Sequence, residues 1–187
     1  MGASFDPALA GEWGAAMGLE FWSKGTNIQE GPGVNIARIE NNGRTFEYLS
    51  GEDPILGGTL IKPLVDGIQQ HVMSITKHYM MNNQETDRSG VNELVDERTL
   101  MELPVDPVAR TACQNELTLK SVLKTWYNFS GFVVSDWGAC HSTSASINGG
   151  LDLEMPQGHF FTEEKNDRGV PYQTSLPIFY DTPYGVY

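Results

Sequence analysis

The first apolar pattern along the chain has the spacing of a helix. It follows Asp6 and Pro7, a capping side chain and a first-turn proline that are typical of a helix start. The apolar residues recur every four positions, at Leu9, Trp13, Met17 and Phe21. Gly25 is well placed to end this helix. The sequence therefore predicts a helix from Pro7 to about Gly25, with these four residues as its apolar stripe.

The same start signal recurs at Asp53–Pro54. It is followed by a second apolar face, formed by Leu56, Leu60, Leu64, Val65 and Ile68. Pro63 lies inside this second helix and is expected to kink it.

Two short apolar runs predict buried strands that end in polar residues. The runs are Val72–Thr76 and Phe132–Val134. Lys77 and His78 follow the first run, and Ser135, Asp136 and Trp137 follow the second. A further strand could begin at 26–28, although Gln29 and Glu30 are poor residues for a buried strand.

Helical patterns at 96–103, 117–126 and 142–147 complete a predicted alternation of helices and strands. This alternation favours an α/β protein with a parallel sheet. Ligands of such proteins bind at the carboxyl ends of the strands. Asp136 is placed at the end of such a strand. A purely structural alternative is that it caps the following helix or forms a turn with Gly138. Residues 157–187 lack periodicity and are predicted to form an irregular C-terminal tail.

Composition and net charge argue against several classes of protein. The chain has 187 residues, enough for one domain with a core, and a net charge of −12. An acidic surface repels phosphate backbones, so nucleic acid is not an expected partner. No apolar stretch has the length of a membrane helix, and no signal-peptide pattern opens the chain. Cys113 and Cys140 are too few for a disulfide scaffold, and neither a metal site nor a cofactor is predicted.

Six motifs occur in series and together resemble one known family. They are Gly31–Arg38, Asn42–Ser50, Glu52–Pro54, Lys77–His78, Asn82–Thr86 and Ser135–Ala139. This series is similar to the catalytic barrel of glycoside hydrolase family 3, especially its β-glucosidases. The resemblance covers about residues 5–156, which predicts a partial N-terminal catalytic barrel over 1–156.

The resemblance implies roles for five residues. Asp136 matches the nucleophile of a retaining mechanism, in which a second carboxylic acid protonates the leaving oxygen. Lys77 and His78 match the pair that binds glucose hydroxyls, and Arg44 matches an arginine that reaches the same sugar. Trp137 would form an apolar wall for the sugar ring. A structural ion pair between Arg44 and Glu47 is the alternative interpretation for that arginine.

Departures from the family pattern predict an incomplete (β/α)8 TIM-barrel-like domain. The family's first strand, with its sugar-binding aspartate, has no counterpart here. A strand with a Cys-Ser-Tyr-Asn segment is also missing, and with it the family partner of Cys113. The general acid/base normally comes from a later domain. Unpaired edges of an open sheet predict self-association through those edges.

The sequence thus predicts a retaining glycoside hydrolase that acts on terminal β-D-glucosyl residues. The alternatives are a remnant that binds carbohydrate without turnover and a truncated product without function. The family resemblance also implies secretion, which the residues themselves do not indicate.

Overall fold

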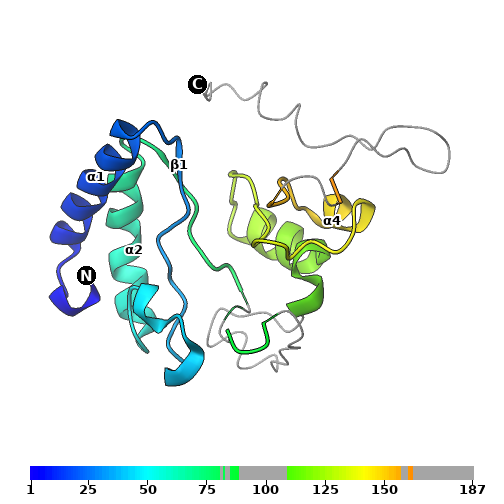
Figure 1. Cartoon of the computed structure of the whole chain (residues 1–187), viewed down its shortest axis with the longest axis horizontal. Coiled ribbons are helices and arrows are strands. Elements are labelled where there is room, and N and C mark those ends of the chain that lie inside the picture. The colour runs from blue at the N-terminus through cyan, green and yellow to red at the C-terminus, as the bar shows by residue number, and fades with distance from the viewer. Residues whose placement is uncertain (81, 83–84, 89–108, 157–159, 162–187) are drawn as a thin grey trace. The chain divides into compact units, whose positions relative to one another are not determined.

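The computed structural model describes residues 1–80, 82, 85–88, 109–156 and 160–161. The chain divides into two compact units, Met1–Ala109 and Arg110–Tyr187, a division that the sequence pattern did not predict. Figure 1 shows the first unit in blue to green and the second in green to orange. The predicted boundary at residue 156 and the helix predicted at 96–103 involve residues outside the described ones, so both stay predictions.

Two helices dominate the first unit. After a short 3-10 turn, η1 (Gly2–Ser4), come α1 (Pro7–Ser23) and α2 (Pro54–Ile68). The Asp6 carboxylate accepts hydrogen bonds from the backbone N–H groups of Ala8 and Leu9, and Asp53 does the same for Ile55 and Leu56. Both predicted starts are therefore confirmed. The second helix continues through Pro63 as a single element.

The two helices lie side by side because glycines remove the side chains between them (Figure 1). A Cβ on Gly14 would lie 2.2 Å from the Leu64 carbonyl oxygen, and one on Gly18 would lie 2.6 Å from the Ile68 carbonyl oxygen. From the other helix, a Cβ on Gly67 would lie 2.3 Å from the Gly11 carbonyl oxygen. Backbone therefore packs directly on backbone at this crossing.

The buried face of α1 differs from the predicted stripe. Its buried residues are Ala10, Gly14 and Gly18. Leu9 and Trp13 are 44% and 42% exposed, while Met17 and Phe21 pack at the edge of the core. The prediction was wrong for the first two residues, because close helix packing favours the smallest side chains over the largest. The core is formed by Ala10, Leu49, Leu60, Leu64, Ile68 and Val72.

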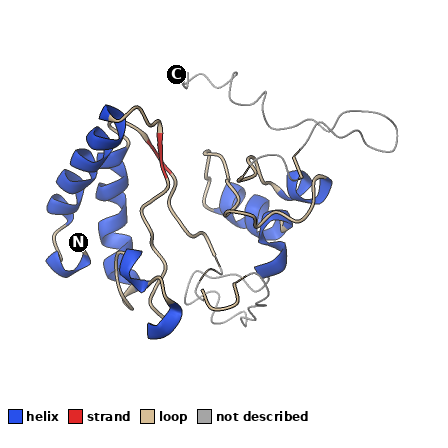
Figure 2. Cartoon of the chain, viewed as in Figure 1, coloured by secondary structure: helices blue, strands red, loops and turns tan. Residues whose placement is uncertain are grey.

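A short parallel sheet follows these helices in the first unit (Figure 2). Strand β1 (Ile28–Gln29) pairs in parallel with β2 (Met73–Ser74), in the register Ile28 to Met73. Gln29 was expected to be poor in a buried strand, yet it is only 7% exposed. Its Nε2 group contacts the Met17 sulfur at 3.6 Å, while its buried Oε1 has no hydrogen-bond partner among the described residues.

Among its described residues, the second unit contains two helices and the loops that flank them. A 3-10 stretch, η4 (Ala109–Gln114), leads into the π-helix η5 (Leu117–Trp126), and α4 spans Ser144–Gly149. Both helices occur where the sequence predicted helices. Leu119, Cys140 and Leu151 are the buried residues of its core.

The strand predicted at Phe132–Val134 is not formed. Only a single bridge pairs Val134 with Leu153, and all three apolar residues are half-buried. The Asp152 carboxylate accepts the Val133 N–H at 2.7 Å. A side chain therefore takes a donor that a longer ladder would have used, which explains why the apolar run did not extend into a strand.

The parallel order of β1 and β2 agrees with an α/β architecture, but two strands of two residues each do not establish an incomplete barrel. That finer description and self-association through open edges stay predictions. Within the described part of the chain, no helix is long and apolar enough to cross a membrane.

Replacing Gly14 with Ala is expected to lower the free energy of unfolding by about 1–3 kcal/mol, because the new methyl group would overlap the Leu64 carbonyl. Urea unfolding measures this change.

Gly58→Ala is the matched control, since Gly58 also lies within a helix but has nothing within 4 Å of the added Cβ. It is expected to raise stability by up to about 1 kcal/mol. Equal effects of the two substitutions would contradict the close crossing.

Candidate functional site

Three backbone segments of the first unit meet beside Gly33. Gly33 forms parallel bridges with both Tyr48 and Lys77. Val34 N–H donates to the Lys77 carbonyl at 2.7 Å, and Leu49 N–H donates to the Gly33 carbonyl at 3.1 Å. This pairing extends the β1–β2 order toward the residues that follow β2. Arg44, Glu47, Tyr48, Lys77 and His78 are called the Arg44–His78 cluster below.

Glu47 joins the two cations of this cluster. Its carboxylate pairs with the Arg44 guanidinium, and its second oxygen lies 3.3 Å from Lys77 Nζ. The Glu47 side chain is 22% exposed and lies in the short 3-10 turn η3 (Thr45–Glu47). Arg44 also lies 3.6 Å from Glu85. The alternative interpretation of Arg44 as an ion-pair partner is thus confirmed, and its contact with sugar stays a prediction.

The cations set the charge state of this carboxylate. Burial raises the pKa of Glu47, but the hydrogen bonds and charges of Arg44 and Lys77 outweigh burial and leave the pKa below its ordinary value. The hydrogen bond with Glu47 is the largest cause that raises the pKa of Arg44. Glu47 is therefore ionised at neutral pH, with two positive partners.

His78 is held by its backbone and by its ring. The backbone N–H donates to Asn35 Oδ1 at 2.7 Å, and ring atom Nδ1 lies 3.1 Å from the Tyr48 hydroxyl. The peptide bond between Lys77 and His78 is cis. Asn35 and Tyr48 were missed as site residues by the sequence analysis, because neither spacing nor polarity distinguishes them from other loop residues.

Asp136 lies in a tight turn of the second unit. The Ala139 N–H donates to the Asp136 carbonyl at 3.0 Å, and Gly138 adopts a positive φ of 73°. One carboxylate oxygen accepts the Trp137 N–H at 2.6 Å. The turn alternative is confirmed, whereas helix capping is wrong because α4 begins at Ser144.

Backbone hydrogen bonds join this turn to residues 153–155. Ser135 N–H donates to the Leu153 carbonyl at 2.9 Å, and Gly138 N–H donates to the Met155 carbonyl at 2.8 Å. Asp136 is half-buried, and Trp137 is 60% exposed. The indole is therefore accessible to a ligand, as a sugar-stacking role needs.

Glu154 is a buried carboxylate that the sequence did not single out. It is 3% exposed and accepts hydrogen bonds from the backbone N–H groups of Phe160 and Phe161. The alternation of Leu151, Leu153 and Met155 would have predicted an exposed Glu154. Its backbone partners explain why burial is tolerated.

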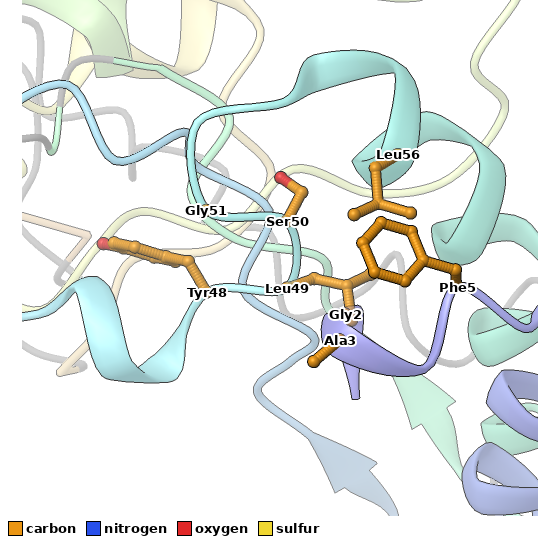
Figure 3. Close-up of a pocket in the computed structure, with 8 residues that line it drawn as sticks. All are labelled: Gly2, Ala3, Phe5, Tyr48, Leu49, Ser50, Gly51 and Leu56. Carbon is orange, nitrogen blue, oxygen red and sulfur yellow. The ribbon is translucent and has the colours of Figure 1, made fainter.

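A pocket of about 370 Å³ opens beside the N-terminal turn and shares Tyr48 with the Arg44–His78 cluster (Figure 3). Its lining carries no charged side chain and consists of Gly2, Ala3, Phe5, Tyr48, Leu49, Ser50, Gly51 and Leu56. It supplies neither a carboxylate nor a cation for catalysis. No group of three or more His, Cys, Asp and Glu residues that could hold a metal occurs among the described residues.

Arg44, Lys77 and His78 are therefore brought together within the first unit, while Asp136 and Trp137 share the turn of the second unit. Each group is defined within its own unit.

Comparison with known proteins identifies the class of this chain. Residues 1–109 match the glycosyl hydrolase family 3 N terminal domain. Thermostable beta-glucosidase B of Acetivibrio thermocellus is 38% identical over 186 residues, covering 88% of this chain and 24% of that protein. Beta-glucosidase BoGH3A of Bacteroides ovatus is 37% identical and is covered over 23% of its length.

Solved structures agree with these relatives. The GH3 beta-glucosidase of Bifidobacterium adolescentis superposes with a TM-score of 0.77 at 36% identity, over 84% of this chain and 26% of that one. Beta-glucosidase 3B of Thermotoga neapolitana, solved with glucose, gives a TM-score of 0.75 at 34% identity, over 83% of this chain and 24% of that one.

The chain belongs to glycosyl hydrolase family 3, within its N-terminal domain. It spans about a quarter of the length of the curated relatives it matches.

Replacing Glu47 with Gln is expected to lower the free energy of unfolding at neutral pH by about 1.5–3 kcal/mol, the contribution of a hydrogen bond to a charged group. Because the folded-state pKa of Glu47 is depressed, its stabilisation is present above the ordinary value of 4.5 and is lost as pH falls through the lower folded-state value. Urea unfolding across this pH range measures the effect.

The difference between the wild-type protein and Glu47→Gln should therefore shrink below about pH 4.5. Glu40→Gln removes an exposed carboxylate of the same unit and serves as the control. A difference that does not change with pH would contradict the ion-pair account.

Cys113 is expected to react slowly with iodoacetamide in the folded protein. Burial is the largest cause that raises the pKa of its thiol to about 12, and only the thiolate is the nucleophile. In a Cys140→Ser variant, unfolding in urea should speed alkylation at about pH 8 by a hundredfold or more. Mass spectrometry measures the rate, and equal rates in both states would contradict the assigned burial.

Proposed function

We propose that this chain forms part of the glucose-binding and nucleophilic site of a retaining β-glucosidase. The gathering of Arg44, Lys77 and His78 in one half-buried cluster, within a chain that belongs to glycosyl hydrolase family 3, carries this proposal. Its relatives at about 37% identity are named as β-glucosidases. Activity of this chain, the mechanism and the residue roles are proposed, and so is an incomplete barrel as the scaffold.

The cluster has the chemistry to orient a polyol. Lys77 and Arg44 are donors only, and their charges strengthen hydrogen bonds to hydroxyl oxygens. Glu47 fixes both cations, so their side chains lose less conformational freedom when a sugar binds. Bonds of this kind lower the barrier where they become stronger in the oxocarbenium-like transition state.

Asp136 is proposed as the nucleophile. A carboxylate oxygen would attack the anomeric carbon, forming an ester bond while the leaving oxygen departs with the electron pair of the broken glycosidic bond. The other oxygen already accepts the Trp137 N–H, which orients the carboxylate. Trp137 would supply an apolar face for the ring. Both residues are assigned to the same sugar through the resemblance of the Ser135–Ala139 motif.

The test is covalent labelling with 2,4-dinitrophenyl 2-deoxy-2-fluoro-β-glucoside. Dinitrophenolate leaves without protonation, so formation of the ester does not depend on a general acid. We expect the mass of one fluoroglucosyl group on the intact protein, with the label on the peptide that contains Asp136. The Asp136→Asn variant should acquire no label, because an amide is a poor nucleophile.

Asp66→Asn is the matched control, since Asp66 lies on the exposed face of α2 in a surface pair with Lys62. It should be labelled like the wild-type protein. Absence of label on folded wild-type protein, or equal labelling of Asp136→Asn, would overturn the assignment of the nucleophile. Glucose binding by an unlabelled protein would instead favour a carbohydrate-binding remnant.

A further inference from the structure

A short acceptor pattern for glycosylation follows the π-helix η5. Asn128, Phe129 and Ser130 form the triplet Asn-X-Ser, and no other Asn-X-Ser or Asn-X-Thr triplet occurs in the 187 residues. This triplet is the acceptor for asparagine-linked glycans, which lie on surface loops of secreted proteins. A glycan is bulky, so the site depends on how Asn128 is placed in the folded chain.

The end of η5 sets the backbone conformation of Asn128. Tyr127 N–H donates to the Val122 carbonyl at 3.0 Å. Phe129 N–H donates to the Leu123 carbonyl at 3.1 Å. Between them, Asn128 adopts a positive φ of 52°, the left-handed conformation that glycine and asparagine tolerate best at the end of a helix. A purely structural reason for an asparagine here is therefore the alternative interpretation.

The two chemically required positions of the triplet are at the surface. Asn128 and Ser130 are both exposed. Phe129, between them, is anchored instead: Lys124 Nζ lies 5.3 Å from the centroid of its ring, and a Cβ on Gly131 would lie 2.5 Å from its Cζ atom. The loop is thus held by Phe129, and a group attached to the Asn128 side chain would extend outward without displacing a packed side chain.

Exposed aromatic side chains lie directly beside the triplet. Trp126 and Tyr127 are 67% and 71% exposed, and no other large apolar side chain among the described residues of the second unit is as exposed. Neighbouring exposed apolar side chains are typical of surfaces that something else covers. A glycan attached to the next residue is within reach of both rings, and the apolar faces of its sugars can pack on them.

We propose that Asn128 is an N-glycosylation site and that its glycan covers Trp126 and Tyr127. The amide nitrogen of Asn128 attacks the anomeric carbon of an oligosaccharide carried on a lipid diphosphate. A C–N bond forms as the C–O bond to the diphosphate breaks, the diphosphate leaves with the electron pair, and the amide nitrogen loses a proton. This transfer belongs to the secretory pathway, so the proposal requires that the chain enters it. It does not depend on the proposed glucosidase function.

Expression of the full chain behind a cleavable signal peptide in a eukaryotic host tests the site. We expect the wild-type protein to carry the mass of one N-linked oligosaccharide, removable by peptide-N-glycosidase, with mass spectrometry locating it on the peptide that contains Asn128. Transfer occurs on the nascent chain, so protein retained in the cell is scored together with secreted protein. Wild-type protein without a glycan would overturn the proposal.

Three variants separate the acceptor pattern from the structural role of the asparagine. Ser130→Ala removes the pattern but keeps Asn128 in place, and it should lose the glycan completely. Ser130→Thr is the matched control, since it keeps the pattern and should keep the glycan. Asn128→Gly should lose the glycan but unfold in urea as Ser130→Ala does, because glycine tolerates the positive φ. A glycan that persists in Ser130→Ala would overturn the assignment.

Acrylamide quenching of tryptophan fluorescence tests the covering of the aromatic rings. Enzymatic removal of the glycan from folded wild-type protein should increase quenching. This increase should disappear in Trp126→Phe and remain in Trp22→Phe, the matched control, because Trp22 is 55% exposed and lies in the first unit. Equal quenching of the wild-type protein with and without the glycan would overturn the contact between glycan and rings.

Discussion

Gly33 determines whether the residues of the Arg44–His78 cluster can meet. It is bridged to Tyr48 on one side and to Lys77 on the other. A Cβ at this position would lie 2.8 Å from Tyr48 Cδ1 and 2.9 Å from the Glu47 carbonyl oxygen. Any side chain would therefore push away the segment that carries Glu47 and Tyr48. The ion pairs of Glu47 and the contact between Tyr48 and His78 both depend on this close approach.

In the Arg44–His78 cluster, one carboxylate lies within ion-pair distance of two cations. Glu47 pairs with both cations, and both are mostly covered, with Arg44 19% and Lys77 27% exposed at the side chain. Exposed ion pairs contribute little to stability, but a half-buried pair with hydrogen bonds fixes side chains in place. The arrangement suits a site that must present donors without rearranging.

The chain belongs to glycosyl hydrolase family 3. The chain matches β-glucosidases over most of its own length but over only about a quarter of theirs. Of the residues singled out in the sequence, Arg44, Lys77 and His78 lie together, and Trp137 follows Asp136 in one turn. The sequence motifs singled out these residues, and their roles toward sugar stay predictions. Asn35 and Tyr48, which fix His78, emerged only from the three-dimensional contacts.

The sequence by itself determined the features that depend on neighbours along the chain. Asp6 and Asp53 cap helices whose first turns they precede, and Gly138 occupies a turn that needs positive φ. The tertiary structure decided which surfaces are buried. Gly14 and Gly18, rather than Leu9 and Trp13, face α2, because backbone contact across that crossing leaves no room for large side chains. Likewise the Phe132–Val134 run stopped short of a strand because Asp152, far along the chain, took the Val133 donor. Such contacts join residues distant in sequence, so no local pattern contains them.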